Sequence, residues 1–260
     1  MLVEGILLPK YAIDGEILAN AFISDGVKEV VISVPEIARQ SKAGQFVHLK
    51  IAQTELLRRP ISISDVDDKA GTLHLIYRIV GKGTKMLSTL RKGDIVNCLG
   101  PLGNGFDLNC QRPLLVGGGM GIAPLIYLAK QFNPQSTSIL LGGKNTVEMF
   151  WKDCFKKLAQ QIYVTTDDGS IGFKGFTVDL LPELLRENEY DRIYVCGPHI
   201  MMESVAKIAK QSNIPCQVSL EKYMACGIGA CLSCTCESKN GGKRKKVCTD
   251  GPVFWAEEVL

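Results

Sequence analysis

Short runs of alternating hydrophobic and polar residues fill the first part of the chain, with Gly, Pro and Asp in the gaps between them. Alternation with a period of two is typical of half-buried β-strands, and Gly, Pro and Asp favour turns. We expect strands at residues 30–34, 45–51, 73–80 and 94–99, and one short helix at 84–90. The pattern predicts a small β-barrel over residues 1–107.

From residue 112 onward, strand-like and helix-like runs alternate, which is typical of a parallel sheet with crossover helices. The expected strands are 114–116, 137–141, 162–165, 192–195 and 216–220, and the expected helices are 122–132, 146–159, 177–187 and 199–211. Residues 221–260 are rich in Cys and Gly and too few to bury a large core, so they should fold around whatever the cysteines bind. We therefore predict an α/β domain over 108–220 and a small metal-binding subdomain over 221–260.

Composition and charge exclude several classes of protein. The 260 residues are 46% hydrophobic and 22% charged, as in ordinary globular proteins, and a net charge of +3 gives no reason to expect nucleic acid. At the N-terminus, Glu4 and Pro9 disfavour a signal peptide, and no apolar run approaches the roughly 18 residues of a membrane-spanning helix. We expect a cytoplasmic protein with no membrane or nucleic-acid partner.

Five of the ten cysteines are clustered near the C-terminus, at Cys226, Cys231, Cys234, Cys236 and Cys248. The first three have the C-x4-C-x2-C spacing of a plant-type [2Fe–2S] cluster, and a further Cys follows later in the chain. The small residues between the first two cysteines let the backbone wrap closely, so that amide N–H groups point at the sulfurs. The spacing predicts a [2Fe–2S] site.

Two alternatives accompany this prediction. Structural zinc also takes four thiolates, although it usually shows paired C-x2-4-C motifs. Cys236 would face the same side as Cys234 on an extended segment, but using it instead would remove the x2 spacing, so we expect it to be a spectator.

The basic segment between Cys236 and Cys248, residues 239–246, is either a solvated turn or a group of cations that acts on the cluster potential or on a partner.

Two short motifs in the barrel region suit a dinucleotide. Arg59-Pro60-Ile61-Ser62 offers a bidentate phosphate donor, a rigid extended turn and a hydroxyl group that could reach a flavin nitrogen. Gly83 and Thr84 stand at a helix N-terminus, where free N–H groups and the helix dipole favour phosphate. Each motif alone is also compatible with a surface Arg and an ordinary Gly-rich turn.

Two further motifs lie at strand ends of the α/β domain. The Gly-rich turn after residues 114–116 allows a phosphate to approach the backbone closely, although it lacks the third Gly of the Rossmann fingerprint. The second motif closes the strand at 192–195, at the same sheet edge, and its Cys suits packing beside a nicotinamide. The candidate residues are Gly117, Gly118, Gly119, Met120 and Gly121 in the first motif, and Cys196, Gly197 and Pro198 in the second.

Together these motifs resemble those of the ferredoxin-reductase superfamily. More narrowly, the chain is similar over nearly its whole length to the electron-transfer subunits of NAD-linked dihydroorotate dehydrogenases, in which Ile61 takes the place of the aromatic that is common elsewhere in the superfamily. The resemblance implies a β-barrel flavin domain that binds FAD through Arg59 to Ser62, Ile76-Tyr77-Arg78 and Gly83-Thr84, an α/β domain that binds NAD, and a cluster held by Cys226, Cys231, Cys234 and Cys248.

The same resemblance implies a function. Dihydroorotate would reduce FMN in a catalytic partner subunit, and electrons would pass through the cluster to FAD here and then to NAD, in pyrimidine (UMP) biosynthesis. Two copies of each chain would form a heterotetramer, with no catalytic residue for dihydroorotate in this chain. The alternatives are a small subunit of another flavin complex (NADPH:ferredoxin oxidoreductase, sulfide dehydrogenase or a hydrogenase diaphorase) and a zinc-bearing interaction module.

Overall fold

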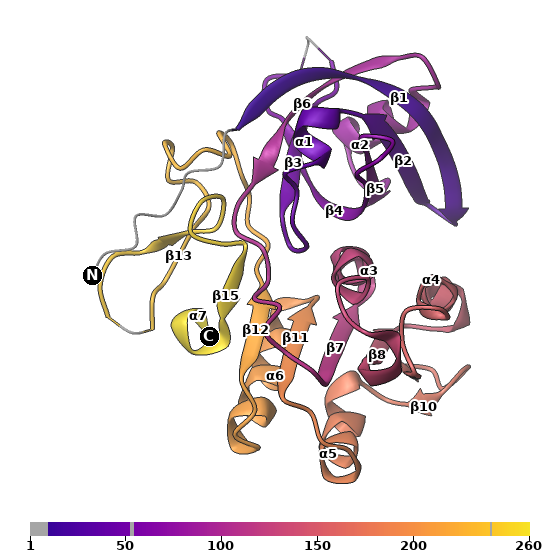
Figure 1. Ribbon diagram of the computed structural model, residues 1–260, viewed down its shortest axis with the longest axis vertical. Helices are drawn as coiled ribbons and strands as arrows, with labels where there is room; N and C mark the ends of the chain where they lie inside the picture. The colour runs from indigo at the N-terminus through magenta and orange to yellow at the C-terminus, as the bar shows by residue number, and fades with distance from the viewer. Residues whose placement is uncertain (1–9, 53–54, 240) are drawn as a thin grey trace.

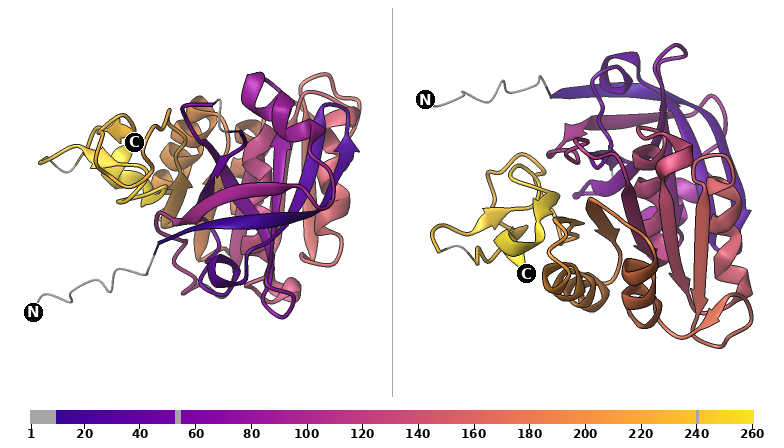
Figure 2. Two further views of the ribbon diagram at one scale, coloured as in Figure 1. Left: turned by 90° about the horizontal axis from the view of Figure 1, so that it is seen from above. Right: turned by 60° about the horizontal axis from the view of Figure 1, so that its bottom comes forward.

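A computed structural model describes residues 10–52, 55–239 and 241–260. The expectation about a signal peptide rests on residues 1–9 and lies outside the described residues. Figure 1 shows the barrel above the α/β domain, with the C-terminal segment beside both of them. The two further views keep this segment on one side of the molecule (Figure 2).

The N-terminal domain is a closed barrel, as the sequence predicts. Its strands are β1 (Tyr11–Ser24), β2 (Val27–Ser33), β3 (Phe46–Lys50), β4 (Arg59–Asp67), β5 (Thr72–Arg78) and β6 (Ile95–Leu102), in the order β1-β2-β5-β4-β3-β6. Helices α1 (Pro35–Ala38) and α2 (Lys82–Thr89) lie in the connections. Alternate residues of each strand point inward, so that Val47 and Leu49 of β3 lie in the barrel core.

A seven-stranded sheet forms the centre of the second domain. Its strands β7 (Pro113–Gly118), β8 (Ser138–Gly143), β9 (Gln161–Thr166), β10 (Phe173–Lys174), β11 (Arg192–Cys196), β12 (Cys216–Ser219) and β15 (Val253–Trp255) have the order β10-β9-β8-β7-β11-β12-β15. All pairs are parallel except β12 with β15. The predicted parallel sheet is therefore confirmed, and residues from the C-terminal segment extend it.

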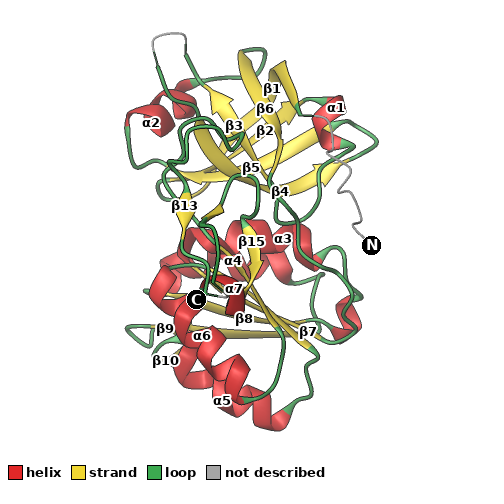
Figure 3. Cartoon of the chain, turned by 90° about the vertical axis from the view of Figure 1, so that its left-hand side faces the viewer, coloured by secondary structure: helices red, strands yellow, loops and turns green. Residues whose placement is uncertain are grey.

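Helices cover both faces of this sheet (Figure 3). Helices α5 (Thr177–Glu187) and α6 (His199–Gln211) pack on one face, and α3 (Ala123–Ala129) and α4 (Trp151–Phe155) pack on the other. Short 3-10 turns lie at Gly119–Ile122, Pro134–Ser136 and Thr146–Phe150. In the part of the chain that the structure describes, no helix is long and apolar enough to cross a membrane.

The helix expected over 146–159 is wrong in kind and length. Asn145 accepts hydrogen bonds from the backbone N–H groups of Val147 and Glu148, which starts a 3-10 turn, and regular helix occupies only Trp151–Phe155. Trp151 and Phe155 are both buried against the sheet. Tertiary burial of these two aromatic residues, rather than a long amphipathic pattern, fixes this short helix.

The C-terminal segment contains little regular structure. It has a two-stranded ladder of β13 (Thr235–Cys236) and β14 (Lys245–Lys246), followed by β15 and helix α7 (Ala256–Val259). Its buried cysteines share one hydrophobic cluster with Phe46 and Leu102 of the barrel and with helices α5 and α6. The segment is therefore packed against both larger domains.

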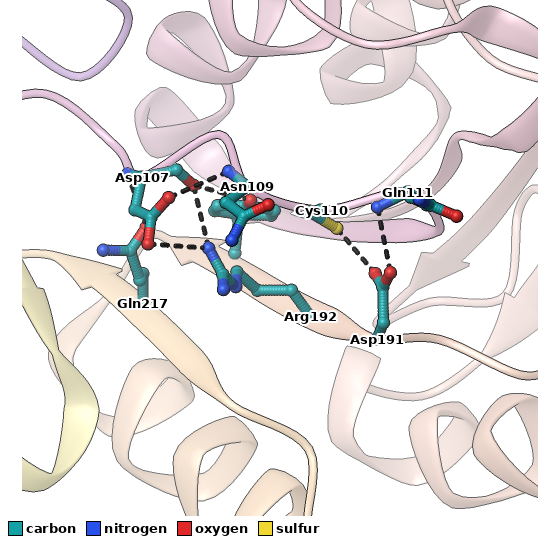
Figure 4. Close-up of polar contacts among 8 residues, drawn as sticks. Asp107, Asn109, Cys110, Gln111, Asp191, Arg192 and Gln217 are labelled. Carbon is teal, nitrogen blue, oxygen red and sulfur yellow. Dashed lines mark hydrogen bonds and ion pairs between the residues drawn. The ribbon is translucent and has the colours of Figure 1, made fainter.

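The linker between the barrel and the sheet is held by charged residues at the start of β11 (Figure 4). Asp191 accepts hydrogen bonds from the thiol of Cys110 and from two linker backbone N–H groups, at 2.7–3.0 Å. Arg192 donates to the carbonyl oxygen of Asp107 at 3.2 Å and pairs with its carboxylate at 3.1 Å. These contacts fix the linker to the α/β domain and so limit rotation of the barrel relative to the sheet.

Candidate functional site

The four predicted cluster ligands come together as two pairs of thiols. The backbone N–H of Cys231 donates to Sγ of Cys226 at 3.4 Å, and the two thiols are within hydrogen-bonding reach of each other. In the same way, the N–H of Cys248 donates to Sγ of Cys234 at 3.4 Å, and their thiols are in contact. The sulfurs therefore lie in two neighbouring pairs, of which Cys226 and Cys231 are at least partly exposed, whereas Cys234 and Cys248 are buried.

This arrangement fits a two-iron cluster. Each iron of such a cluster takes two protein ligands, whereas a structural zinc ion draws four thiolates around one point. The donor set and its pairing match two irons, each with two thiolates.

The backbone around Cys226 stabilises a thiolate. Burial opposes ionisation of this thiol, but the N–H groups of Ile228 and Cys231 and the thiol of Cys231 outweigh that cost, and the pKa of Cys226 falls to about 6. The loop can turn its N–H groups inward because Gly227 and Gly229 have φ values of +70° and +81°. A deprotonated sulfur is the form that binds iron.

Cys236 belongs to neither of these pairs, although it lies in the same hydrophobic cluster as Cys234 and Cys248. It is buried in β13, and burial raises the pKa of its thiol. No hydrogen bond between its thiol and another cysteine occurs among the described residues. The role of Cys236 as a spectator stays a prediction.

A second candidate site is a cavity of about 370 Å³ between the barrel and the α/β domain. It brings together Arg59, Pro60, Ile61, Ser62, Ile76, Tyr77, Arg78 and Thr84 of the barrel motifs. Gly83 does not line it, but a Cβ at Gly83 would collide with the guanidinium group of Arg59. The phenol of Tyr77 points into the barrel, where it donates to Asn20 at 2.9 Å, so Tyr77 offers mainly its backbone to the cavity.

Arg59, which lines this cavity, shares a carboxylate with Lys82, which lies just outside the lining. Arg59 Nη2 lies 2.7 Å from Glu55 Oε2, and Lys82 Nζ lies 2.8 Å from Glu55 Oε1. The hydrogen bond from Lys82 is the main reason that the pKa of Glu55 is lowered. A guanidinium and an ammonium group that converge on one anion make this place suitable for a pyrophosphate. These residues therefore fit the dinucleotide FAD.

A third candidate site is a cavity of about 580 Å³ at the carboxyl edge of the parallel sheet. Of the predicted residues, Gly118, Gly119, Met120 and Pro198 line it. Arg78 and Met120 line both this cavity and the one in the barrel, so the two are adjacent. Lys144 stands beside the acidic residues Glu148 and Asp167 on its wall, which leaves little net positive charge for an extra phosphate group.

The other predicted residues of these two turns lie behind the cavity wall. A Cβ at Gly121 would lie 2.5 Å from the backbone nitrogen of Gly197, so the two turns pack against each other. A Cβ at Gly117 would lie 2.8 Å from the side chain of Ile122 and 2.9 Å from that of Leu125, in the following helical segment. Cys196 is buried, and burial raises the pKa of its thiol well above the usual range. These four residues shape the site from outside the cavity.

We expect a Gly121→Ala substitution to lower the free energy of unfolding by about 2–3 kcal/mol, because the new methyl group would overlap backbone atoms that cannot move aside cheaply. Weaker NAD binding should accompany this loss, since the two turns border the cavity. Chemical denaturation and NAD titration would measure both effects. Gly119→Asn is the matched control for stability, because nothing lies within 4 Å of a Cβ there and Asn tolerates its φ of +56°. Equal stability of the two variants would contradict the packing argument.

Several residues of these sites carry no signal in the sequence. Ser219, Leu220, Glu221, Lys222, Met224 and Pro252 come from the C-terminal part of the chain and line the barrel cavity. Such residues reach the cavity only through folding, so motif spacing could not have identified them.

Family models match three parts of the chain. Residues 14–106 match the oxidoreductase FAD-binding domain, residues 115–207 match the oxidoreductase NAD-binding domain, and residues 221–260 match the iron-sulfur cluster binding domain of dihydroorotate dehydrogenase B. The matches place FAD, NAD and cluster chemistry in the barrel, the α/β domain and the C-terminal segment, respectively.

Similar proteins agree with these matches. The electron transfer subunit of dihydroorotate dehydrogenase B (NAD(+)) from Caldanaerobacter subterraneus subsp. tengcongensis is 41% identical, over 96% of this chain and 99% of the relative. The subunit of the same name from Fusobacterium nucleatum is 44% identical, over 83% and 86%. Among solved structures, a chain of the NADH-dependent reduced ferredoxin-NADP oxidoreductase has a TM-score of 0.85 at 33% identity, covering 95% of this chain and 89% of that one.

Proposed function

The chain belongs to the family of dihydroorotate dehydrogenase B (NAD(+)) electron transfer subunits, and from this premise we propose that it carries electrons from dihydroorotate oxidation in a catalytic partner subunit to NAD+. The reaction is a step of pyrimidine (UMP) biosynthesis. The observation that supports this role most directly is the presence of three sites in one chain, with a paired-thiol loop, a barrel cavity and a sheet-edge cavity packed together.

The bound groups supply the redox chemistry: the cluster exchanges single electrons, and FAD converts them into the hydride that NAD+ accepts. This chain holds and orients them. Cys226, Cys231, Cys234 and Cys248 are the proposed ligands of the cluster. Backbone N–H groups that point at their sulfurs offset the charge of the thiolates.

The barrel cavity is the proposed FAD site. Arg59 and Lys82 would hold the pyrophosphate in place of the Glu55 carboxylate, and Ser62 would offer its hydroxyl group to the flavin. Met120 and Ala123 of the α/β domain close the cavity on the side of the nicotinamide site and exclude water there. The sheet-edge cavity is the proposed NAD site, with Gly118 and Gly119 on its wall.

We expect Arg59→Ala to lower the FAD content of the purified chain at least tenfold, because a charge-assisted bidentate donor to the pyrophosphate is lost. Iron and sulfide content should stay at two each per chain, since the cysteine loop does not include Arg59. Flavin absorbance and iron assays on the same sample would measure this. Lys50→Ala is a suitable control, because this barrel residue does not line the cavity. Full FAD occupancy in Arg59→Ala would contradict the assignment.

Apolar side chains around the cysteine loop support docking of the catalytic subunit at this place. Tyr223, Ile228 and Leu232 are 95%, 51% and 61% exposed, and the proposed ligand Cys231 is exposed between them. Exposed apolar groups of this size in one small area are typical of an interface. A partner seated there would bring its flavin near the cluster. We propose that two copies of each chain assemble as a heterotetramer.

The ten free cysteines suit a reducing compartment, and we propose a cytoplasmic location.

The alternative role, as the small subunit of an NADPH:ferredoxin oxidoreductase, draws on the likeness to the ferredoxin-NADP oxidoreductase chain. It is not favoured, because the relatives with higher identity are dihydroorotate dehydrogenase B subunits.

Reduction of the anaerobic complex by dihydroorotate tests the proposal. Bleaching of flavin and iron-sulfur absorption by dihydroorotate, and its recovery on addition of NAD+, is the expected result. Bleaching by reduced ferredoxin or NADPH but not by dihydroorotate would favour the alternative instead.

A further inference from the structure

A buried histidine lies between the barrel and the cysteine loop. Val47 and Leu49 of β3 point into the barrel, so Phe46 and His48 point outward, beneath the C-terminal segment. The side chain of His48 is completely buried, and its ring lies 5.6 Å from the ring of Phe46. Phe46 lines the barrel cavity, so this pair of rings occupies the space between that cavity and the loop.

The His48 ring faces the loop that holds the first thiol pair. A Cβ at Gly227, next to Cys226, would lie 2.8 Å from Nδ1 of His48 and 2.9 Å from its Cε1. Only a glycine at this position, with its φ of +70°, permits such a close approach. Gly227 therefore serves two purposes: it turns the loop and it admits the imidazole ring.

Neither ring nitrogen of His48 has a hydrogen-bond partner in the described residues. Arg58 donates to the backbone carbonyl of His48 at 3.2 Å and so does not satisfy the ring. Buried polar groups are almost always hydrogen-bonded, and an orphaned one indicates a missing partner such as a bound ligand. The cluster site, on the other side of Gly227, is where such a partner belongs.

On the basis of the proposed function, we propose that His48 is a positioning residue for the cluster, whose ring N–H donates a hydrogen bond to a sulfur atom of the Cys226–Cys231 side of the site and raises the reduction potential of the cluster. Hydrogen bonds to the sulfurs are one of the means by which a protein sets this potential. The reduced cluster carries one more negative charge than the oxidised one, so a donor stabilises the reduced form more strongly.

The environment of His48 keeps the ring neutral. Burial, and next to it the charge of Arg58, lower the pKa of the imidazole to about 4. A neutral imidazole has one N–H donor and one acceptor nitrogen. In this form the ring has one N–H donor to offer to the site.

A redox titration of the cluster, followed by electron paramagnetic resonance in the complex with the catalytic subunit, tests this proposal. In His48→Phe, which keeps a ring but removes the donor, we expect the ratio of reduced to oxidised cluster at a fixed potential to fall about three- to tenfold. Tenfold corresponds to 59 mV for a one-electron couple. His48→Gln, whose amide keeps an N–H donor, should restore most of the ratio. His74→Gln is the matched control, because His74 is paired with Glu29 on the barrel.

A second measurement begins with the wild-type protein and uses the variants only to assign the signal. The chain has three histidines, so ¹⁵N-histidine introduced into this chain alone should produce a nitrogen coupling in the pulsed spectrum of the reduced wild-type cluster. The coupling should persist in His74→Gln and disappear in His48→Gln. A cluster that is present but shows no coupling, with an unchanged potential in His48→Phe, would overturn the role of His48. Absence of iron and sulfide from the wild-type protein would instead overturn the proposed function.

Discussion

Replacing Cys231 by Ser is expected to reduce electron transfer from dihydroorotate to NAD+ at least a hundredfold, while oxidation of NADH by an artificial dye continues near the wild-type rate. Serine is a poorer ligand than thiolate for iron, and Cys231 is one member of the first thiol pair. The cavities proposed for FAD and NAD do not include the loop from Cys226 to Cys234. NADH can therefore still reduce FAD, and a dye can take the electrons directly.

Both activities would be measured on the same anaerobic preparation of the complex, with iron, sulfide and flavin assays. Cys154→Ser is the matched control, because Cys154 lies on α4, which belongs to the α/β domain, and is not part of either thiol pair. The control should retain both activities. If Cys231→Ser lost dye reduction as well, the cysteine would be needed for the fold of the chain rather than for a cluster alone.

Hydrophobic periodicity predicted most of the regular structure. The helices expected at 177–187 and 199–211 have those same bounds in α5 and α6, because each has a continuous amphipathic pattern. The longest strand, β1, was not predicted, since Asp14 and Gly15 form a turn signal near its start. In the fold, Gly15 stays within the strand, where a Cβ would collide with Ile32 and Val34. Close packing, which the sequence pattern does not encode, accounts for this glycine.

The candidate site also has parts that the sequence predicts and parts that only the fold reveals. Ligand spacing within one loop is a local property, so the cysteine pattern could be read directly from the sequence. Contacts between segments that are far apart in the sequence could not be predicted in this way. His48 contacts Gly227, and Gly121 contacts Gly197, only in the folded chain. A glycine in a strand-to-helix turn permits the close approach either of a phosphate or of a neighbouring backbone segment. Only the fold shows which of the two a given glycine permits.

Charge placed on the apolar surface around the cysteine loop should separate this chain from its catalytic partner. We expect Leu232→Asp combined with Ile228→Asp to weaken association at least a hundredfold, because both side chains are more than half exposed and a partner that covers them would have to bury two unpaired carboxylates. Size-exclusion chromatography and light scattering of the mixed subunits would measure the association. Dihydroorotate-dependent NAD+ reduction should fall in parallel, while NADH:dye activity and cofactor content stay unchanged.

The control for this variant uses the same change at an exposed apolar position elsewhere. Ile95 is 58% exposed at the start of β6, whereas Leu102, near Gly227, lies at the other end of that strand. At about 3.3 Å per residue, the two positions are roughly 23 Å apart. Ile95→Asp should therefore bind the partner normally, since it is distant from the loop. If it weakened association as much as the double variant, the docking surface would have to include the outer face of the barrel. Normal association of the double variant would exclude the loop surface as the docking site, and the electron path from the partner would then need another entry point.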